Sequence, residues 1–238
     1  MLSRILVRIM KNRIYADRRD AGRALAPEIQ ACELHDPIVL GLPRGGIPVA
    51  YEIALALDAP LDVLVVRKLG VPFQPELALG AIASGQVRVL NEQLLEQIPG
   101  LDEALIEEIT ARETKELTRR EKLYRGDRPY PELRGRDVVV VDDGMATGST
   151  MRAAAEAVRS TDPAKVLIAV PTASADAVAL VADIVDQVIC LDTPSPFFAV
   201  GYFYRNFGQT TDDEVRSLLH DAWEGQQLSG RTTNAKRQ

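Results

Sequence analysis

The sequence contains little cysteine or histidine and no apolar run of membrane-spanning length. Its 238 residues include two cysteines, Cys32 and Cys190, and two histidines, His35 and His220. The cysteines lie far apart among apolar neighbours, so they predict buried free thiols, not a metal site or a disulfide framework. The histidines form no metal-ligand pattern. Because no stretch reaches the roughly 20 apolar residues of a membrane-spanning helix, these absences favour a cytoplasmic protein with no membrane partner.

Basic residues are fewer than acidic ones, which argues against a nucleic-acid-binding surface. The chain has 28 Lys and Arg residues against 34 Asp and Glu residues, a net charge of −6. This total leaves room for a local basic patch but does not favour nucleic acid as a partner. Apolar residues make up 46% of the chain. That content and the length favour one α/β domain with a small appendage.

The first nine residues alternate apolar side chains with Arg4 and Arg8. The apolar stretches are too short and too interrupted for a signal peptide. We therefore expect residues 1–9 to be an N-terminal extension, with Met10 as a candidate translation start.

The most informative stretch runs from Val138 to Thr150 and reads VVVVDDGMATGST. Four valines in a row predict a strand buried on both faces, as in a parallel sheet. Asp142 and Asp143 follow the strand, and a turn of small residues leads into an Ala-rich helix over 151–159. Backbone N–H groups of such a turn and of a helix N-terminus point at one spot, which suits a phosphate. Adjacent carboxylates suit sugar hydroxyls or a hydrated divalent cation.

Two other nucleotide-binding turns do not fit this stretch. A Walker turn requires G-x-x-x-x-G-K-[ST], and no lysine occurs between Gly144 and Thr150. A dinucleotide fingerprint requires G-x-G-x-x-G, and the glycine spacing here is different. The plain alternative is an ordinary strand-to-helix turn, with both aspartates solvated and capping the helix.

Two further predicted strands end in candidate anion-binding residues. Residues 38–42 predict a short buried strand, followed by Pro43-Arg44-Gly45-Gly46 and a helix over 47–57. Residues 61–66 predict a third strand, which ends in Arg67-Lys68. Glycines let an anion approach backbone N–H groups, and two cations at a strand end would match a diphosphate. The plain alternatives are a structural turn with a solvent-facing arginine and a basic rim on the sheet.

The rest of the chain alternates helices with strands, which predicts parallel crossovers. Asp17 or Asp20 is the expected cap of a first helix that runs to about Cys32. The other expected elements are helices over 101–125, 175–182 and 212–223 and strands over 165–170 and 187–191. The fold class is therefore α/β, a doubly wound and mainly parallel five-stranded sheet with flanking helices. Ligands bind such sheets at the carboxyl ends of the strands.

Three stretches are expected to lie outside this alternation. Residues 69–80 contain two glycines and two prolines and predict a loop, and a hairpin over 79–90 would turn at Ser84-Gly85. Half of the twelve aromatic residues fall within residues 197–207. Residues 228–238 are polar and predict a disordered tail.

The stretch from Val138 to Thr150 resembles the phosphoribosyl diphosphate (PRPP) signature of the type I phosphoribosyltransferases over all thirteen residues. This resemblance implies that Asp142 and Asp143 are catalytic acids that contact the ribose hydroxyls and reach Mg²⁺ through water. It implies that the turn after them binds the 5-phosphate. The turn at Arg44 would bind the diphosphate, commonly around a non-proline cis peptide bond. The implied PRPP-binding residues are Arg44, Gly45, Gly46, Arg67, Lys68, Gly144, Met145, Ala146, Thr147, Gly148, Ser149 and Thr150.

The same resemblance implies a transferase domain over residues 10–223. A lid loop and hairpin would occupy residues 69–91, and a hood with the C-terminal cover would occupy residues 192–223. The acceptor, a nucleobase or similar nitrogenous compound, would be received at the end of the strand that precedes the hood, and one of the aromatic rings could stack on it. The plain alternative is a small hood that only packs on the sheet. A homodimer is the assembly that the resemblance implies.

Three functions remain open from the sequence. The first is Mg²⁺-dependent transfer of ribose 5-phosphate from PRPP to a base, as in nucleotide salvage, with release of diphosphate. The second is a PRPP-binding regulator with little catalysis, because residues 69–80 carry no Lys or Arg that could act as a lid cation. The third is a nucleoside-phosphate phosphorylase or hydrolase that uses the same phosphate turn.

Overall fold

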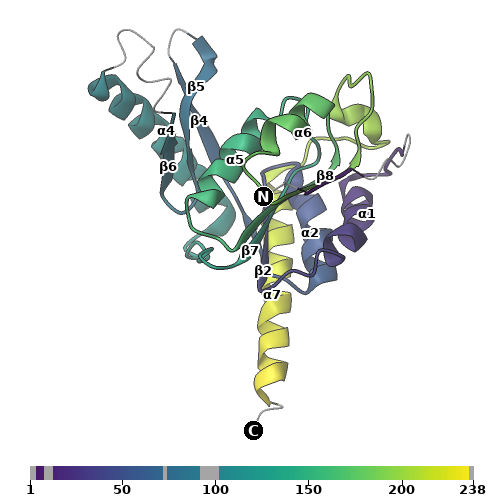
Figure 1. The fold of residues 1–238 in the computed structure, drawn as a ribbon. Coiled ribbons are helices and arrows are strands. Elements are labelled where there is room, and N and C mark those ends of the chain that lie inside the picture. The colour runs from purple at the N-terminus through teal and green to yellow at the C-terminus, as the bar shows by residue number, and fades with distance from the viewer. Residues whose placement is uncertain (1–3, 8–12, 72–73, 92–101, 236–238) are drawn as a thin grey trace.

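The described residues, 4–7, 13–71, 74–91 and 102–235 of a computed structural model, form a main sheet of six parallel strands. The strand order is β1-β9-β8-β7-β2-β3, and Figure 1 labels β8, β7 and β2 of this sheet. The strands are β1 Arg4–Val7, β2 Pro37–Gly41, β3 Leu61–Val63, β7 Asp137–Val141, β8 Lys165–Thr172 and β9 Gln187–Asp192. The five predicted strands are present, although the third ends at Val63 and not at Val66. The sixth strand, β1, was not predicted and pairs with β9. Met10, the candidate translation start, lies outside the described residues.

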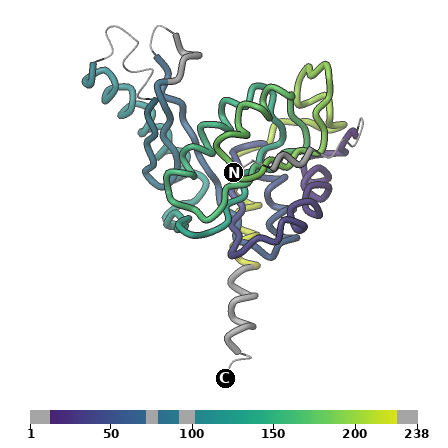
Figure 2. The backbone as a smooth tube through the Cα atoms, viewed as in Figure 1, coloured from purple at the N-terminus to yellow at the C-terminus, as the bar shows by residue number. Residues whose placement is uncertain are grey.

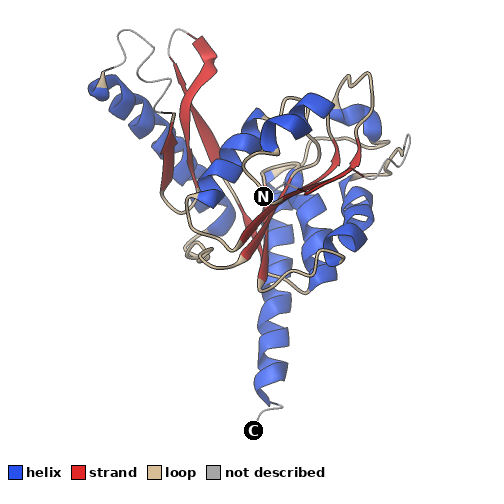
Figure 3. Cartoon of the chain, viewed as in Figure 1, coloured by secondary structure: helices blue, strands red, loops and turns tan. Residues whose placement is uncertain are grey.

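Helices cover both faces of the main sheet, as expected for a doubly wound fold (Figure 3). The helices on one face are α1 Arg18–Gln30, α2 Gly46–Leu57 and α7 Asp212–Ala235, and those on the other are α5 Ser149–Arg159 and α6 Ala175–Val181. Successive valines of β7 alternate between the two cores. Val139 and Val141 pack with the first group of helices, and Val138 and Val140 pack with the second. This alternation explains why a continuous apolar run is needed in a central parallel strand.

A second, antiparallel sheet projects from one side of the main sheet (Figure 2). It contains β4 (Val66–Val71), β5 (Gln74–Ala83) and β6 (Val87–Leu90). The hairpin predicted at Ser84-Gly85 joins β5 to β6. The prediction of a loop over residues 69–80 is wrong, because β4 and β5 pair through most of this stretch. Only residues 72–73 of it lie outside the described residues. The pairing shifts register on either side of Gly70, and such irregularities are how strands accommodate a glycine.

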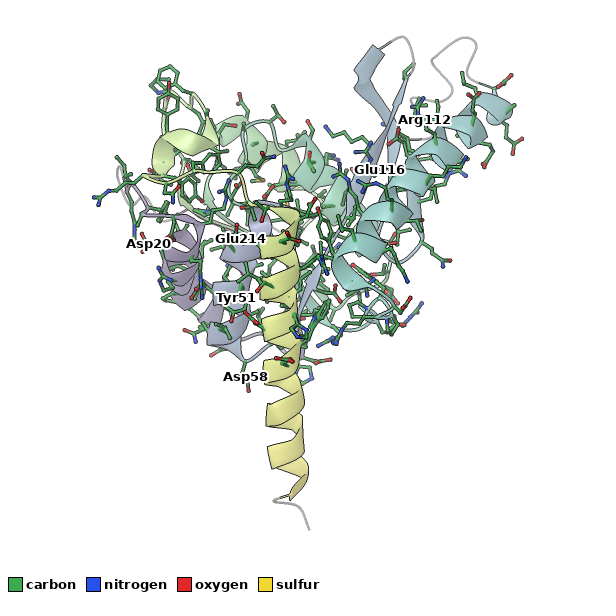
Figure 4. The ribbon with its side chains drawn as sticks, turned by 180° about the vertical axis from the view of Figure 1, so that it is seen from behind. Asp20, Tyr51, Asp58, Arg112, Glu116 and Glu214 are labelled. Atoms are coloured by element: carbon green, nitrogen blue, oxygen red, sulfur yellow. The ribbon has the colours of Figure 1, made fainter. Side chains whose placement is uncertain are left out.

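The long charged helix predicted near residues 101–125 is α4 (Glu103–Arg125), which packs beside the second sheet (Figure 4). Its surface carries the expected intrahelical ion pairs, since Glu116 accepts hydrogen bonds from Arg119 and Arg120 at 2.7 Å. At its C-terminal end, Arg125 pairs with Asp62 of β3 at 2.9 Å, and each side chain is 5% exposed. This buried ion pair joins α4 to the edge of the main sheet.

The C-terminal part of the chain differs from its prediction. Residues 228–235, expected to be disordered, continue α7 to Ala235, and only 236–238 lie outside the described residues. The helix begins where Thr211 Oγ1 accepts a hydrogen bond from the Glu214 N–H at 3.1 Å. Its first half packs against α2, and extending a formed helix adds one hydrogen bond for each residue that is ordered. Within the described residues, no helix is both long and apolar enough to cross a membrane.

Both cysteines are free, as predicted. Cys190 is fully buried in β9, and Cys32 is partly buried after α1.

Candidate functional site

The turn after β7 is hydrogen-bonded to the end of β8 before the chain enters α5. Met145 donates its backbone N–H to the Thr172 carbonyl at 3.0 Å, and Ser174 donates its N–H back to Met145 at 2.9 Å. Gly148 then adopts φ +75, a left-handed conformation that favours glycine, and α5 begins at Ser149. The turn therefore ends at a helix N-terminus, where unpaired N–H groups and the helix dipole favour an anion.

The turn after β2 has the same design. The Pro43–Arg44 peptide bond is cis, which agrees with the bond expected there from the resemblance. Gly45 caps α2, which begins at Gly46. Two helix N-termini therefore follow neighbouring strands of one sheet.

The two turns are brought into contact by strand pairing. β2 and β7 are parallel neighbours with Gly41 opposite Val141, and Leu42 donates its N–H to the Val141 carbonyl at 2.9 Å. A Cβ placed on Gly45 would lie 2.1 Å from Asp143 Oδ2. Such contact leaves no room for a side chain, so the glycine turn packs directly on the acid pair.

Gly46 makes a similar approach to the first acid. A Cβ there would lie 2.6 Å from the Val141 carbonyl oxygen and 3.2 Å from Asp142 Oδ1. Close packing thus requires glycine at both positions. The sequence had suggested glycine there only because it lets an anion approach backbone N–H groups.

The acid pair is partly buried. Burial and the neighbouring Asp143 carboxylate raise the pKa of Asp142 well above its ordinary value. Burial also raises the pKa of Asp143, although a hydrogen bond from Arg18 opposes this effect. Two adjacent carboxylates in such a place gain from a cation or from hydroxyl donors. A hydrated metal ion supplies the cation, and a polyol supplies the hydroxyl donors.

Arg18, at the start of α1, is a site residue that sequence reasoning missed. Its Nε donates to Asp143 Oδ2 at 2.7 Å. The expected cap of this helix is present, since Asp17 accepts the Asp20 N–H at 2.8 Å. The available signal was the charged start of the helix, residues 15–22, which reads equally well as an ordinary surface helix. The contact with Asp143 spans 125 positions of the chain, and no local pattern encodes it.

The remaining predicted cations do not converge on one point. Arg44 lies 3.8 Å from Asp212 at the start of α7. Arg67 and Lys68 were expected at the end of a strand of the main sheet, but they lie within β4 of the second sheet. The reason is that the chain leaves the main sheet after Val63 and re-pairs with β5.

The two residues of β4 have different surroundings. Arg67 forms an ion pair with Glu113 of α4 at 2.6 Å, so protein already provides its counter-charge. Lys68 borders a cavity of about 350 Å³ that Ser149 and Arg152, at the start of α5, also line. Lys68 therefore borders the same cavity as the end of the turn that follows β7, whereas its charge had suggested a place on the diphosphate.

The hood divides into an exposed tip and a base that contacts the acid pair. At the tip, Phe198 and Tyr202 are 74% and 71% exposed. At the base, the Tyr204 hydroxyl donates to the Asp143 carbonyl oxygen at 2.6 Å. The Phe207 ring lies beside Tyr204, with their centroids 5.0 Å apart. Within the hood, Tyr204 thus contacts the acid pair, with Phe207 packed beside it.

Comparisons with known proteins agree on one family. Residues 12–204 match the family model described as "Phosphoribosyl transferase domain". Two Mycobacterium tuberculosis proteins, from strains CDC 1551 / Oshkosh and ATCC 25618 / H37Rv, are both named "Putative phosphoribosyl transferase". Each is 50% identical over 210 residues, which cover 88% of this chain and 47% of the relative. The chain thus spans about half the length of these curated relatives. The crystal structure of TT1426 from Thermus thermophilus is 43% identical with a TM-score of 0.81, over 87% of this chain and 97% of that one.

Proposed function

Because this chain belongs to the phosphoribosyl transferase family, we propose that it binds PRPP between its two turns and transfers ribose 5-phosphate to a nitrogen nucleophile. The observation that carries this proposal is the direct packing of Gly45 and Gly46 on Asp142 and Asp143. PRPP has a phosphate at one end of its sugar and a diphosphate at the other. Two adjacent helix N-termini with a pair of acids between them match that charge distribution.

Each end of PRPP has a proposed set of ligands. The turn from Gly144 to Thr150 would bind the 5-phosphate, because it ends at the N-terminus of α5 and carries the hydroxyls of Thr147, Ser149 and Thr150. Arg44 and the N–H groups at Gly45 and Gly46 would bind the diphosphate at the N-terminus of α2. Lys68 would supply a cation to the 5-phosphate side, since it shares a cavity with Ser149.

Mg²⁺ fits the acid pair as an ion held mainly by water and substrate. The described residues contain no cluster of three or more metal-ligating side chains. Asp142 and Asp143 supply oxygen ligands, which Mg²⁺ prefers, and it usually retains several waters beside one or two carboxylates and phosphate oxygens. Bound with PRPP, the ion would neutralise charge on the departing diphosphate.

The chain's own residues would act by positioning and by charge. The bond between C1 and the diphosphate oxygen breaks with its electron pair on the oxygen, which leaves an oxocarbenium-like ribose. The acceptor nitrogen then bonds to C1 and loses its proton to solvent. Asp142 and Asp143 would hold the ribose hydroxyls, while Arg44 and the α2 N-terminus would stabilise the leaving group.

Incubation with PRPP, Mg²⁺ and a panel of nucleobases tests the proposal. Base-dependent release of diphosphate supports transfer, and base-independent breakdown of PRPP indicates a hydrolase. Asp143→Asn should lower PRPP use by about 10²-fold, the loss expected for one preorganised polar contact. The matched control is Asp58→Asn, because Asp58 is exposed at the opposite end of α2 from Gly46 (Figure 4). An unchanged rate in Asp143→Asn would remove that residue from the site.

A second candidate is a PRPP-binding regulator that does not turn over. The lack of Lys or Arg in residues 69–80 favours it, because a cation on a closing lid would otherwise help to hold the diphosphate. Saturable binding of PRPP without release of diphosphate for any base would select this function. The acceptor, a homodimer, a cytoplasmic location and the domain limits at residues 10–223 remain predictions.

A further inference from the structure

The Arg18 guanidinium is fixed from three directions. Its Nε donates to Asp143 Oδ2, and its Nη1 donates to the Gly208 carbonyl oxygen, both at 2.7 Å. The Phe207 ring lies 4.0 Å from its Cζ, in cation–π contact. The Arg18 and Asp143 side chains are 12% and 15% exposed, so this ion pair is largely removed from solvent. Charge-assisted hydrogen bonds of this kind are stronger than neutral ones.

These contacts join four segments that are distant in the chain. Arg18 comes from the first turn of α1, and Asp143 comes from the end of β7. Phe207 and Gly208 form the base of the hood. Gly45 of the second turn packs against Asp143 Oδ2, the same oxygen that accepts from Arg18. The Asp143 carboxylate is therefore held between an arginine and a glycine turn.

The backbone of Asp143 is held as well, because Tyr204 of the hood donates its hydroxyl to the Asp143 carbonyl oxygen at 2.6 Å. Arg18 and Tyr204 thus bind the side chain and the main chain of the same residue, and both lie against Phe207. A carboxylate that must meet two sugar hydroxyls gains from such support, since preorganised groups pay no ordering cost when the ligand arrives.

We propose that Arg18 is a positioning residue, which holds the Asp143 carboxylate in its sugar-binding orientation and fixes the base of the hood beside it. This inference rests on the proposed PRPP site and adds to it a residue from α1. Arg18 need not touch PRPP; it acts through Asp143.

A cavity beside Arg18 makes the inference testable by chemical rescue. The cavity has a volume of about 320 Å³ and is lined by polar side chains that include Asp17, Asn206 and Glu214 together with Arg18 itself. Figure 4 shows Glu214 on the first turn of α7, next to α2. Truncation of Arg18 would extend this cavity to Asp143. Free guanidinium could then occupy the vacated position and donate to the same carboxylate.

The experiment compares the PRPP affinity of full-length variants by calorimetry with Mg²⁺ present. Arg18→Ala should bind PRPP about 10–100-fold more weakly than the wild type, the loss seen when residues that orient ligand-binding groups are removed from metal sites. Arg18→Lys should recover part of the affinity, because lysine keeps the charge but not the planar fork. Millimolar guanidinium, but not equal sodium chloride, should restore binding to Arg18→Ala. Arg23→Ala is the control, because the exposed Arg23 of α1 pairs with Glu52 of α2.

The outcomes separate the two proposals. If the wild type binds no PRPP, the proposed function fails and this inference fails with it. If the wild type binds PRPP and Arg18→Ala binds it equally well, only the inference fails. A loss in Arg18→Ala that neither lysine nor guanidinium reverses would mean a purely structural role and would also overturn it. Thermal unfolding of each variant establishes that the compared proteins are folded.

Discussion

Replacing Gly45 by alanine tests how closely the two turns must pack. Gly45 has φ −63 and ψ −31, an ordinary right-handed helical conformation in which alanine meets no backbone strain. Its Cβ would nevertheless lie 2.1 Å from Asp143 Oδ2 and 2.6 Å from Asp143 Cγ. Real Cβ atoms essentially never show a contact below 3.0 Å, so the Asp143 carboxylate must shift from the position in which it accepts from Arg18.

The magnitude follows from two opposing effects. Overpacking at a tightly filled position costs about 1–3 kcal/mol. Glycine-to-alanine substitution at a compatible backbone gains about 0.4–1 kcal/mol by restricting the unfolded chain. We therefore expect Gly45→Ala to lower the free energy of unfolding by about 1 kcal/mol, and by no more than about 2.6 kcal/mol, measured by urea denaturation. PRPP affinity should fall together with stability, because the displaced carboxylate belongs to the proposed site.

Two further variants test whether the clash with the Asp143 carboxylate causes the loss of stability. At Gly225 in α7 an added Cβ meets no atom within 4 Å, so Gly225→Ala should gain about 0.5–1 kcal/mol from helix propensity. In Gly45→Ala/Asp143→Ala the clashing carboxylate is gone, and the two effects should be non-additive by about 0.5–3 kcal/mol. A Gly45→Ala protein as stable as the wild type, with unchanged PRPP affinity, would refute the packing between the turns.

Two further predictions concern the supports of the site and of the sheet edge. Tyr204→Phe removes the hydrogen bond to the Asp143 carbonyl and should lower the free energy of unfolding by about 0.5–1.5 kcal/mol; equal urea midpoints for the two proteins would contradict this. Burial raises the pKa of Asp62 from 3.8 to about 6, although Arg125 opposes it. The folded state then binds more protons than the unfolded state between these values, so stability should fall by about 2 kcal/mol as pH rises from about 4 to 6. Asp62→Asn should remove this part of the pH dependence, and an unchanged slope in that variant would refute the assignment.

Local patterns predicted the parts of the site that are built from consecutive residues. The valine run, the acid pair and the small-residue turn specify a strand, its end and a helix N-terminus within thirteen positions. The unit at 38–57 repeats that design, so the parallel pairing of the two strands could be expected. The cis bond at Pro43–Arg44 could be expected only from the resemblance, because no residue type there requires it.

Long-range pairing accounts for what the sequence did not predict. Residues 69–80 look like a loop by composition, but residues 69–71 of β4 pair with residues 74–80 of β5. This pairing carries Arg67 and Lys68 out of the main sheet. The bond from Arg18 to Asp143 depends on the packing of α1 on α2 and on β8, which follows from the whole fold. The polar end of α7 continues a helix that is already formed, so composition alone was a poor guide there.

The most direct test of the central claim is a crystal structure of the protein with PRPP and Mg²⁺. We predict that the 5-phosphate lies at the turn from Gly144 to Thr150, the diphosphate at Arg44 to Gly46, and the ribose hydroxyls against Asp142 and Asp143. PRPP bound elsewhere, or crystals and calorimetry that detect no PRPP between the two turns, would contradict the account.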